Sequence, residues 1–184
     1  MNRTTIINAA AGLFESKGYS ATSMRDLAEK VGLMPSSLYS HINSKQEILK
    51  EICMQCAYQF TDGMHEVKQN NNNPQQSIDA LIKLHVDIAN SFPSSIAVFN
   101  DEWRFMEAKD ITTFKKLRTQ YEKNFKDILQ EGKDKGIFNY IDLDVVFLII
   151  LSTLNRTYQS VGKYNKNKVE VEINHFIKNA LKNT

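Results

Sequence analysis

Apolar residues recur at intervals of three or four along nearly the whole chain, the spacing that places them on one face of a helix. The first such stretch carries Ile6, Ala10, Leu13 and Phe14 and ends at Gly18. Alternating apolar and polar positions are almost absent, and the 184 residues include only three prolines and seven glycines. The pattern therefore predicts an all-α protein.

A second helical stretch follows with its own start and stop residues. Ser23 and Asp26 have the spacing of a capping box, in which a hydroxyl and a carboxylate satisfy the free N–H groups of a first helical turn. Leu27 and Val31 then lie on one apolar side, and Gly32 is suited to a left-handed helix end. These residues predict a short helix that stops at residue 32.

A third short helix is predicted directly afterwards. Pro35 suits a first helical turn, where its missing N–H removes no hydrogen bond. Leu38 and Ile42 lie four residues apart and face inward, while Ser44 and Glu47 have the spacing of a further capping box. Two short helices around a tight turn, at about residues 24–43, are typical of a helix-turn-helix reader of DNA. A plain three-helix module with a polar surface is the alternative that geometry alone leaves open.

Short hydroxyl side chains on such a helix can approach phosphates and base edges, and a phenol can reach a phosphate oxygen. A lysine near a helix N-terminus adds positive charge where backbone amides already favour an anion. The predicted DNA-contacting residues are Thr22, Ser23, Arg25, Pro35, Ser36, Ser37, Tyr39, Ser40, His41 and Lys45.

Residues 6–49 carry an ordered set of matches to one known family. The matches are Ala9-Ala10, Leu13-Phe14, Gly18-Tyr19, Thr22 to Ala28, Val31-Gly32, Ser37-Leu38-Tyr39, His41, and Ser44-Lys45 to Leu49. In this region the chain resembles the TetR family of bacterial repressors. The resemblance implies a helix-turn-helix DNA-binding domain at residues 1–50. Two departures are visible, because Ile42 stands where the family usually has an aromatic residue and the reading helix carries no Arg or Lys.

The remainder of the chain reads as a string of amphipathic helices that form one helical domain for ligand binding and dimerisation, residues 51–184. The polar tract 69–76 predicts a loop. The apolar stripes span residues 49–67, 78–89, 96–106, 111–128, about 144–161 and about 168–181.

Several residues of this second domain combine aromatic walls with polar groups at helical spacing, the composition of a ligand pocket. The predicted ligand-binding residues are Phe99, Trp103, Arg104, Met106, Arg118, Tyr121, Asn155 and Tyr158. Arg118 and Tyr121, three residues apart, are expected to converge on one point. The alternative is that the aromatic residues are ordinary core and the polar groups pair with each other. His85, on an apolar stripe, is either a core histidine or a pocket wall.

The order Asn100 to Arg104, Arg118, Tyr121, Gly132, Lys135 to Phe138 and Asn155 to Tyr158 resembles the branch of TetR regulators that respond to acyl-coenzyme A thioesters. The resemblance implies that DNA is released when an acyl chain and its nucleotide head enter the helical domain. Phe99, Trp103 and Met106 would then line the acyl chain, and Arg104 and Arg118 would contact phosphate or thioester. A drug-responsive efflux repressor of the same family is the alternative, followed by a helical protein-binding adaptor.

A homodimer is expected because one reading helix covers only half of an operator. Two C-terminal helices are apolar around more of their circumference than one core can absorb, which predicts a four-helix interface. The predicted interface residues are Leu148, Leu151, Ile173, Phe176, Ile177 and Leu181.

Composition and charge exclude only a few classes of protein. The formal net charge is +2 with a pI of about 8.4, so any positive patch must be local. The longest apolar run, Val145 to Leu151, is shorter than the roughly 20 residues of a membrane span, and no secretory leader is expected. Cys53 and Cys56 fall on an apolar stripe and are interpreted as buried hydrophobic residues. A cytoplasmic protein without metal, cofactor or catalytic residues is predicted.

Overall fold

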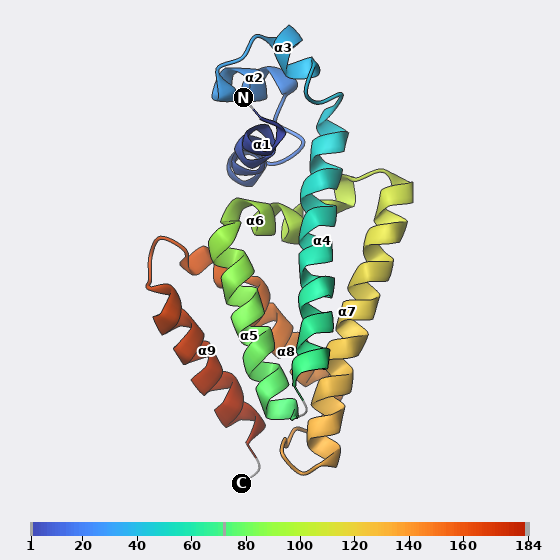
Figure 1. The fold of residues 1–184 in the computed structure, drawn as a ribbon, viewed down its shortest axis with the longest axis vertical. Helices are drawn as coiled ribbons and strands as arrows, with labels where there is room; N and C mark the ends of the chain where they lie inside the picture. Colours follow the sequence, from blue (N-terminus) through green and yellow to red (C-terminus); the bar gives the residue numbers. More distant parts are fainter. Residues whose placement is uncertain (1, 72, 183–184) are drawn as a thin grey trace. The chain divides into compact units, whose positions relative to one another are not determined.

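The computed structural model describes residues 2–71 and 73–182. Within these residues the chain forms nine α-helices and two short 3-10 turns (Figure 1). Their bounds are α1 (Arg3–Lys17), α2 (Met24–Val31), α3 (Pro35–Tyr39), α4 (Lys45–Asn70), α5 (Pro74–Ser91), α6 (Pro93–Asp101), η1 (Trp103–Phe105), α7 (Ala108–Asp134), α8 (Leu143–Asn155), η2 (Thr157–Ser160) and α9 (Lys166–Leu181). The predicted all-α class is confirmed.

The helices group into two compact units. Unit 1 comprises Met1–Tyr58 and Ser94–Lys116, and unit 2 comprises Gln59–Pro93 and Leu117–Thr184. The long helices α4 and α7 each contribute to both units. Unit 1 thus contains residues 51–58 and 94–116 in addition to residues 1–50, which the sequence predicts as a domain.

Unit 1 is built around the three N-terminal helices, in which α2 packs against both α1 and α3. Ile6 and Phe14 from α1, Leu27 from α2 and Leu38 from α3 are each no more than 2% exposed and meet in one core. Burying such side chains contributes about 1.5–3 kcal/mol each, which fixes three short helices that would be unstable alone. The core therefore sets the orientation of α3.

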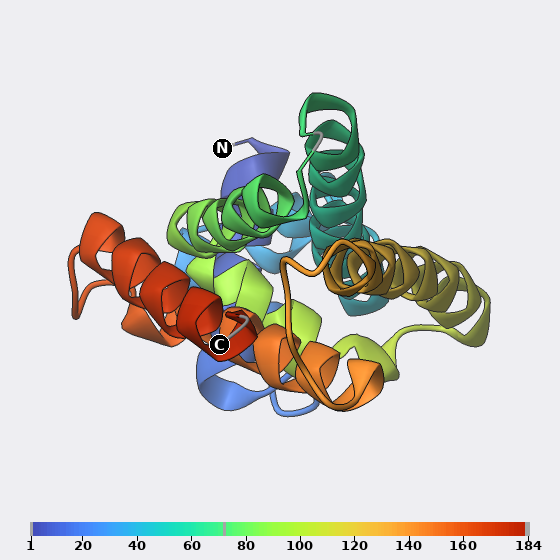
Figure 2. The ribbon, with the colours of Figure 1, turned by 90° about the horizontal axis from the view of Figure 1, so that it is seen from below.

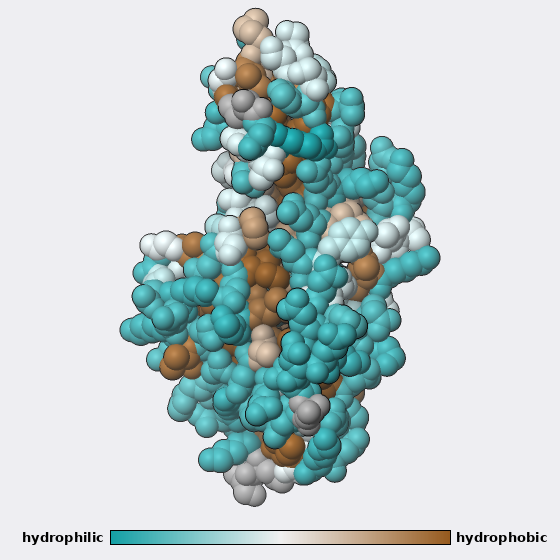
Figure 3. Space-filling model, viewed as in Figure 1, coloured by the Kyte–Doolittle hydropathy of each residue, from teal (hydrophilic) through white to brown (hydrophobic). Residues whose placement is uncertain are grey.

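In unit 2 the helices α8 and α9 pack against α5. The helix α9 lies beside α5 in both ribbon views (Figures 1 and 2). Its core includes Ile78 and Leu81 from α5, Phe125 and Leu129 from α7, and Leu154 from α8. Polar side chains cover most of the face drawn in Figure 3, and an apolar strip lies beside α5. A Lys178–Asp79 ion pair of 2.7 Å joins α9 to α5 at their surface.

Three segments differ from the prediction in where their helices end. The stripe at residues 96–106 is not one helix, because α6 ends at Asp101 and the chain tightens into η1 at Trp103. The predicted helix 144–161 ends earlier, at Asn155, where the 3-10 turn η2 follows a short break. The loop is shorter than the predicted tract 69–76, because α4 extends to Asn70 and α5 begins at Pro74. Asn72 lies outside the described residues.

Candidate nucleic-acid interface and polar core

The start of α2 is fixed by the capping box that the sequence predicts. The Ser23 hydroxyl accepts a hydrogen bond from the Asp26 backbone N–H at 3.1 Å, and the Asp26 carboxylate accepts one from the Ser23 N–H at 2.8 Å. Lys17 adds an ion pair to Asp26 at 2.9 Å. The Ser23 hydroxyl also donates to the Asp26 carboxylate. This bond, followed by those from the Lys17 ammonium and the Ser23 N–H, lowers the pKa of Asp26 well below its ordinary value. At the other end Gly32 has φ +68°, the left-handed conformation expected for it.

The short helix α3 presents its polar side chains to solvent. Pro35 occupies its first turn and Leu38 is completely buried. The predicted outward set is exposed and comprises Ser36, Ser37, Tyr39, Ser40 and His41. The Ser40 hydroxyl donates to the Ser37 carbonyl at 2.7 Å, so this hydroxyl is engaged within the helix. Arg25 and Ser23, at the start of α2, are also exposed.

Two predicted contact residues have a different role in the structure. The Thr22 side chain is buried, and its hydroxyl donates to the Gly18 carbonyl at 2.9 Å. The Lys45 ammonium donates to the carbonyls of Tyr19 at 2.8 Å and Thr22 at 2.7 Å and lies 4.3 Å from the Tyr19 ring centroid. The Thr22 hydroxyl therefore ties the loop between α1 and α2 to the end of α1, and Lys45 ties the same loop to α4. The polar atoms of both side chains are directed at the protein backbone, whereas the sequence predicts that they contact DNA.

The end of the reading region is held by Arg3, which the sequence reasoning did not single out. Its guanidinium donates to the carbonyl of His41 at 2.7 Å and pairs with Glu47 at 2.6 Å and Glu51 at 2.5 Å. The Arg3 hydrogen bond, followed by one from the Asn43 N–H, lowers the pKa of Glu47. The Glu47 carboxylate thus accepts the capping hydrogen bond from the Asn43 N–H rather than from the Ser44 N–H. The Ser44 hydroxyl accepts from the Glu47 N–H at 3.1 Å, as predicted. Two carboxylates four residues apart on one helix were the available signal for an arginine partner.

Phe105 links η1 to the rest of unit 1. Its ring stacks on Tyr19 with centroids 5.6 Å apart, and its carbonyl accepts from Gln46 Nε2 at 2.8 Å. Lys50 and Asp110 form an ion pair of 2.8 Å in the same unit. These contacts give the physical reason why residues 94–116 belong with the N-terminal helices.

Part of the predicted ligand-binding set gathers around Phe114 in unit 1. Trp103 stacks on the Phe114 ring at 5.3 Å, and Phe99 meets the same ring edge-on at 5.4 Å. The Arg104 guanidinium lies 4.9 Å from the Trp103 ring centroid, and the Lys115 ammonium lies 5.7 Å from it. Met106 is buried. The result is a half-buried indole with two cations beside it.

The other four predicted ligand residues belong to unit 2, where Arg118 and Tyr121 take separate partners. Arg118 is exposed and pairs with Glu122 at 2.7 Å, whereas the buried Tyr121 hydroxyl lies 2.7 Å from His85 Nε2. The predicted convergence of Arg118 and Tyr121 is therefore wrong, because Arg118 faces solvent and Tyr121 faces the core. Asn155 ends α8 and Tyr158 lies in η2, where its hydroxyl accepts from Arg156 at 3.1 Å.

His85 and Tyr121 form a polar pair inside an otherwise apolar core. The Phe60 ring lies 4.7 Å from the His85 ring and 5.8 Å from the Tyr121 ring. Burial lowers the pKa of His85 to about 3, so the imidazole is neutral at physiological pH. Burial likewise raises the pKa of Tyr121. This pair is a neutral hydrogen bond, and it confirms that His85 is a core residue.

The predicted dimer residues divide into two groups. Leu148 is 62% exposed and Phe176 is 59% exposed, and Leu151 and Ile173 are half-buried. Ile177 and Leu181 are each 1% exposed, because they face the core of their own subunit. The prediction that these last two lie on the interface surface is corrected accordingly.

Both cysteines are buried and free, as the apolar stripe predicted. Burial raises the pKa of the Cys56 thiol to about 12, which keeps it protonated. In the described residues no group of three His, Cys, Asp or Glu side chains is arranged to hold a metal ion. None of the described helices is long and apolar enough to cross a membrane.

Comparisons with known proteins cover almost all of the chain. A family model described as bacterial regulatory proteins, tetR family, matches residues 6–52, and one described as tetracyclin repressor-like, C-terminal domain, matches residues 71–178. The chain is 26% identical over 153 residues to the HTH-type transcriptional repressor KstR2 of Rhodococcus jostii, which covers 82% of this chain and 75% of that protein.

Solved structures share the fold. The ketosteroid transcriptional regulator KstR2 of Mycobacterium tuberculosis matches with a TM-score of 0.89 and 22% identity, covering 99% of this chain and 95% of that chain. AibR in complex with isovaleryl coenzyme A and operator DNA matches with a TM-score of 0.81 and 16% identity, over 96% of this chain and 98% of that chain. At these identities the two structures are evidence of the fold alone.

Proposed function

Because the chain belongs to the TetR family of bacterial regulatory proteins, we propose that the exposed side chains around α3 form its operator-recognising surface. The chain is a DNA-binding, ligand-responsive transcriptional repressor that acts as a homodimer. The observation that carries the assignment of the surface is the complete burial of Leu38, which turns Ser36, Ser37 and Tyr39 outward.

Within this surface we assign different roles to different groups. Ser36, Ser37 and His41 are assigned to base edges. The Tyr39 phenol and the Arg25 guanidinium are assigned to phosphates. Thr22 and Lys45 act as positioning residues, since their side chains fix the loop before α2. Arg3 positions the carbonyl of His41 in the same way.

For the dimer we propose an interface formed by α8 and α9 of each subunit. Leu148, Leu151, Ile173 and Phe176 are the anchors, because each leaves apolar surface uncovered within its own subunit. A two-fold axis then pairs the same helices of both copies. Buried aromatic and aliphatic anchors of this kind carry most of the binding energy in an interface.

Leu148→Glu is expected to raise the dimer dissociation constant by about tenfold or more, because a charge loses its hydration when the interface closes. Sedimentation equilibrium over a range of protein concentrations measures the change. Ile141→Glu is the matched control, since Ile141 is 101% exposed in the loop before α8 and its replacement should leave the dimer intact. A dimer equally stable in both variants would argue against α8 as an interface helix.

For the effector we propose an acyl-coenzyme A thioester. The supporting observation is the Trp103 indole, which packs on Phe114 and lies close to Arg104 and Lys115. Aromatic surface suits an acyl chain or an adenine ring, and the two cations suit phosphates. The same ligand class is named in the isovaleryl coenzyme A complex of AibR. Phe99 and Met106 complete the apolar part of this candidate site.

Fluorescence anisotropy on a labelled operator tests the effector class. Acyl-coenzyme A thioesters are expected to release the DNA, and Arg104→Ala is expected to raise the required concentration by about tenfold, since a charge-assisted hydrogen bond contributes about 1.5–3 kcal/mol. Lys116→Ala is the matched control, because Lys116 is exposed on α7 and the cations found beside the Trp103 ring, among the described residues, are Arg104 and Lys115. Release by lipophilic cations instead would favour a drug-responsive efflux repressor, and equal responses of the two variants would contradict the assigned cations. Native mass spectrometry of protein from its source organism would identify a retained thioester by mass.

The route from effector to DNA is proposed to include α4. This helix runs without interruption from Lys45, which holds the loop before α2, to Asn70 in unit 2. An effector that favours one arrangement of the helices would change the spacing of the two reading helices in the dimer. The coupling free energy expected for such a change is about 1–3 kcal/mol. We further propose that the protein acts in the cytoplasm, where operator DNA lies, and by binding alone without catalysis.

A further inference from the structure

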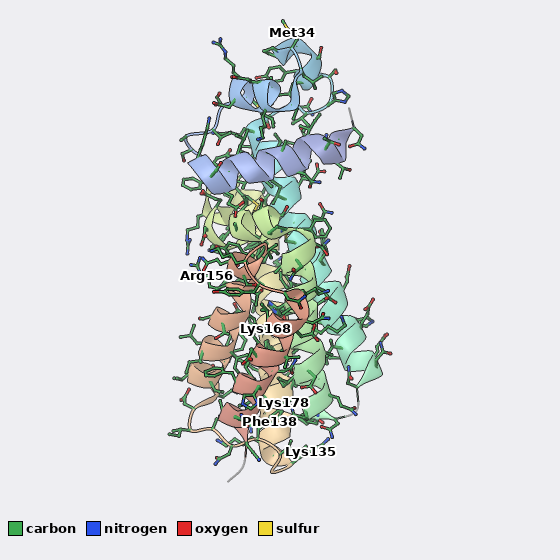
Figure 4. The ribbon with its side chains drawn as sticks, turned by 90° about the vertical axis from the view of Figure 1, so that its left-hand side faces the viewer. Met34, Lys135, Phe138, Arg156, Lys168 and Lys178 are labelled. Carbon is green, nitrogen blue, oxygen red and sulfur yellow. The ribbon has the colours of Figure 1, made fainter. Side chains whose placement is uncertain are left out.

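The residue that precedes α3 is an exposed methionine. Met34 is 70% exposed. This is the highest exposed fraction among the exposed large apolar side chains of unit 1. In Figure 4 its side chain lies at the outer end of the turn between α2 and α3. Leaving an unbranched apolar side chain of this size in water yields no stabilisation of the fold.

Local helix stability does not explain the methionine either. Met34 is the N-cap residue of α3, with φ −66° and ψ 143°, and no side-chain hydrogen bond caps the helix. Ser, Thr, Asp or Asn at an N-cap stabilise a helix relative to an apolar residue. A residue that disfavours local structure and remains in solvent points to a functional contact.

The chemistry of the neighbouring side chains indicates which contact this is. Residues 33–42 contain no Arg, Lys, Asn or Gln, the side chains that make bidentate hydrogen bonds to guanine or adenine. The N-terminal residues of a recognition helix are those that meet base edges in the major groove. The apolar group displayed there is the C5-methyl of thymine.

We propose that Met34 is a specificity-determining residue that recognises a thymine methyl group in each operator half-site. This inference rests on the proposed role of α3 as the reading helix and adds a base preference to it. Met34 supplies an apolar contact to the methyl group, at a place where the neighbouring hydrogen-bonding side chains are short. A thymine at one fixed position of each half-site is the consequence.

Replacing thymine by deoxyuridine removes only the methyl group and therefore tests the proposal directly. The operator is first selected from a random duplex library with the wild-type protein, and each thymine is then replaced in turn. One position per half-site is expected to weaken wild-type binding about fourfold, because burial of a methyl-sized group contributes about 0.8 kcal/mol. Symmetric replacement in both half-sites should multiply the two effects.

Three variants separate the methyl contact from general weakening. Met34→Ala and Met34→Ser should bind thymine and deoxyuridine operators equally, and Met34→Leu should retain the discrimination. Tyr39→Phe should weaken both operators while keeping their ratio, since Tyr39 is assigned to a phosphate. Met34→Ser also permits a capping hydrogen bond, so its loss of discrimination cannot be attributed to unfolding.

The outcomes are distinguishable. A wild-type preference that persists in Met34→Ala, or the absence of any methyl-sensitive thymine, would overturn the role of Met34 while leaving the reading helix in place. Failure of the wild-type protein to select any operator would instead contradict the proposed DNA-reading surface, and with it this inference.

Discussion

Gly132→Ala is expected to lower the free energy of unfolding by about 3 kcal/mol, the upper part of the range for overpacking a core. An added Cβ at Gly132 would lie 2.0 Å from Cδ2 of Phe138 and 2.3 Å from Cε2 of the same ring. The ring cannot easily move, because Phe138 is 2% exposed and its backbone N–H donates to the Gly132 carbonyl at 3.0 Å. The chain therefore requires a residue without a Cβ at this point of α7.

The geometry arises where α7 ends. Gly136 adopts φ +68° and reverses the chain, so that Phe138 folds back over the last turns of the helix. The neighbouring Asn139 N–H donates to the Leu181 carbonyl at 2.9 Å, which joins this reversal to the end of α9. A clash at Gly132 thus disturbs the connection between two helix ends. Figure 4 shows Phe138 at this end of unit 2.

Gly12→Ala is the matched control because it changes the same residue type inside α1. An added Cβ at Gly12 meets no atom within 4 Å. This variant should stabilise the protein by about 0.5–1 kcal/mol through the higher helix propensity of alanine. Urea unfolding at fixed protein concentration measures both variants. In a Phe138→Leu background the cost of Gly132→Ala should fall clearly, and an unchanged cost there would show that the ring is not the cause.

Lowering the pH from 7 to 5 is expected to reduce the free energy of unfolding by about 2 kcal/mol per subunit through His85. Burial lowers the pKa of His85 to about 3, whereas the unfolded chain has the ordinary value of about 6.5. Below pH 6.5 the unfolded state therefore binds a proton that the folded state does not. The stability is complete above pH 6.5 and falls progressively as the pH decreases toward 3.

The double variant His85→Phe/Tyr121→Phe isolates this effect. It replaces both partners of the 2.7 Å hydrogen bond by apolar groups of similar shape, so neither is left buried without a partner. The variant should fold and should lose about 2 kcal/mol of the pH dependence between pH 7 and pH 5. Denaturant titrations at several pH values provide the measurement, and parallel curves for the two proteins would mean that His85 is accessible to protons in the folded state.

The sequence by itself determined the local structure of the N-terminal helices. The Ser23–Asp26 capping box, the left-handed Gly32, the position of Pro35 and the inward side of Leu38 all follow from residues within a few positions of each other. Such interactions require no knowledge of distant segments. The ordered matches from residue 6 to residue 49 then sufficed to indicate the family.

Only the tertiary structure decided which partner each long polar side chain takes. Lys45 was predicted at DNA and instead meets the carbonyls of Tyr19 and Thr22, and Tyr121 was predicted to converge with Arg118 and instead meets His85. Each of these side chains is flexible enough to reach several partners. The partner it takes depends on the residues that pack beside it, and some of these lie more than 20 positions away in the sequence. Helical periodicity likewise places Ile177 and Leu181 on an apolar helix face. Their burial against their own subunit depends on where the other helices lie. Spacing along a chain fixes the face of a helix, whereas the packing of distant helices decides what that face meets.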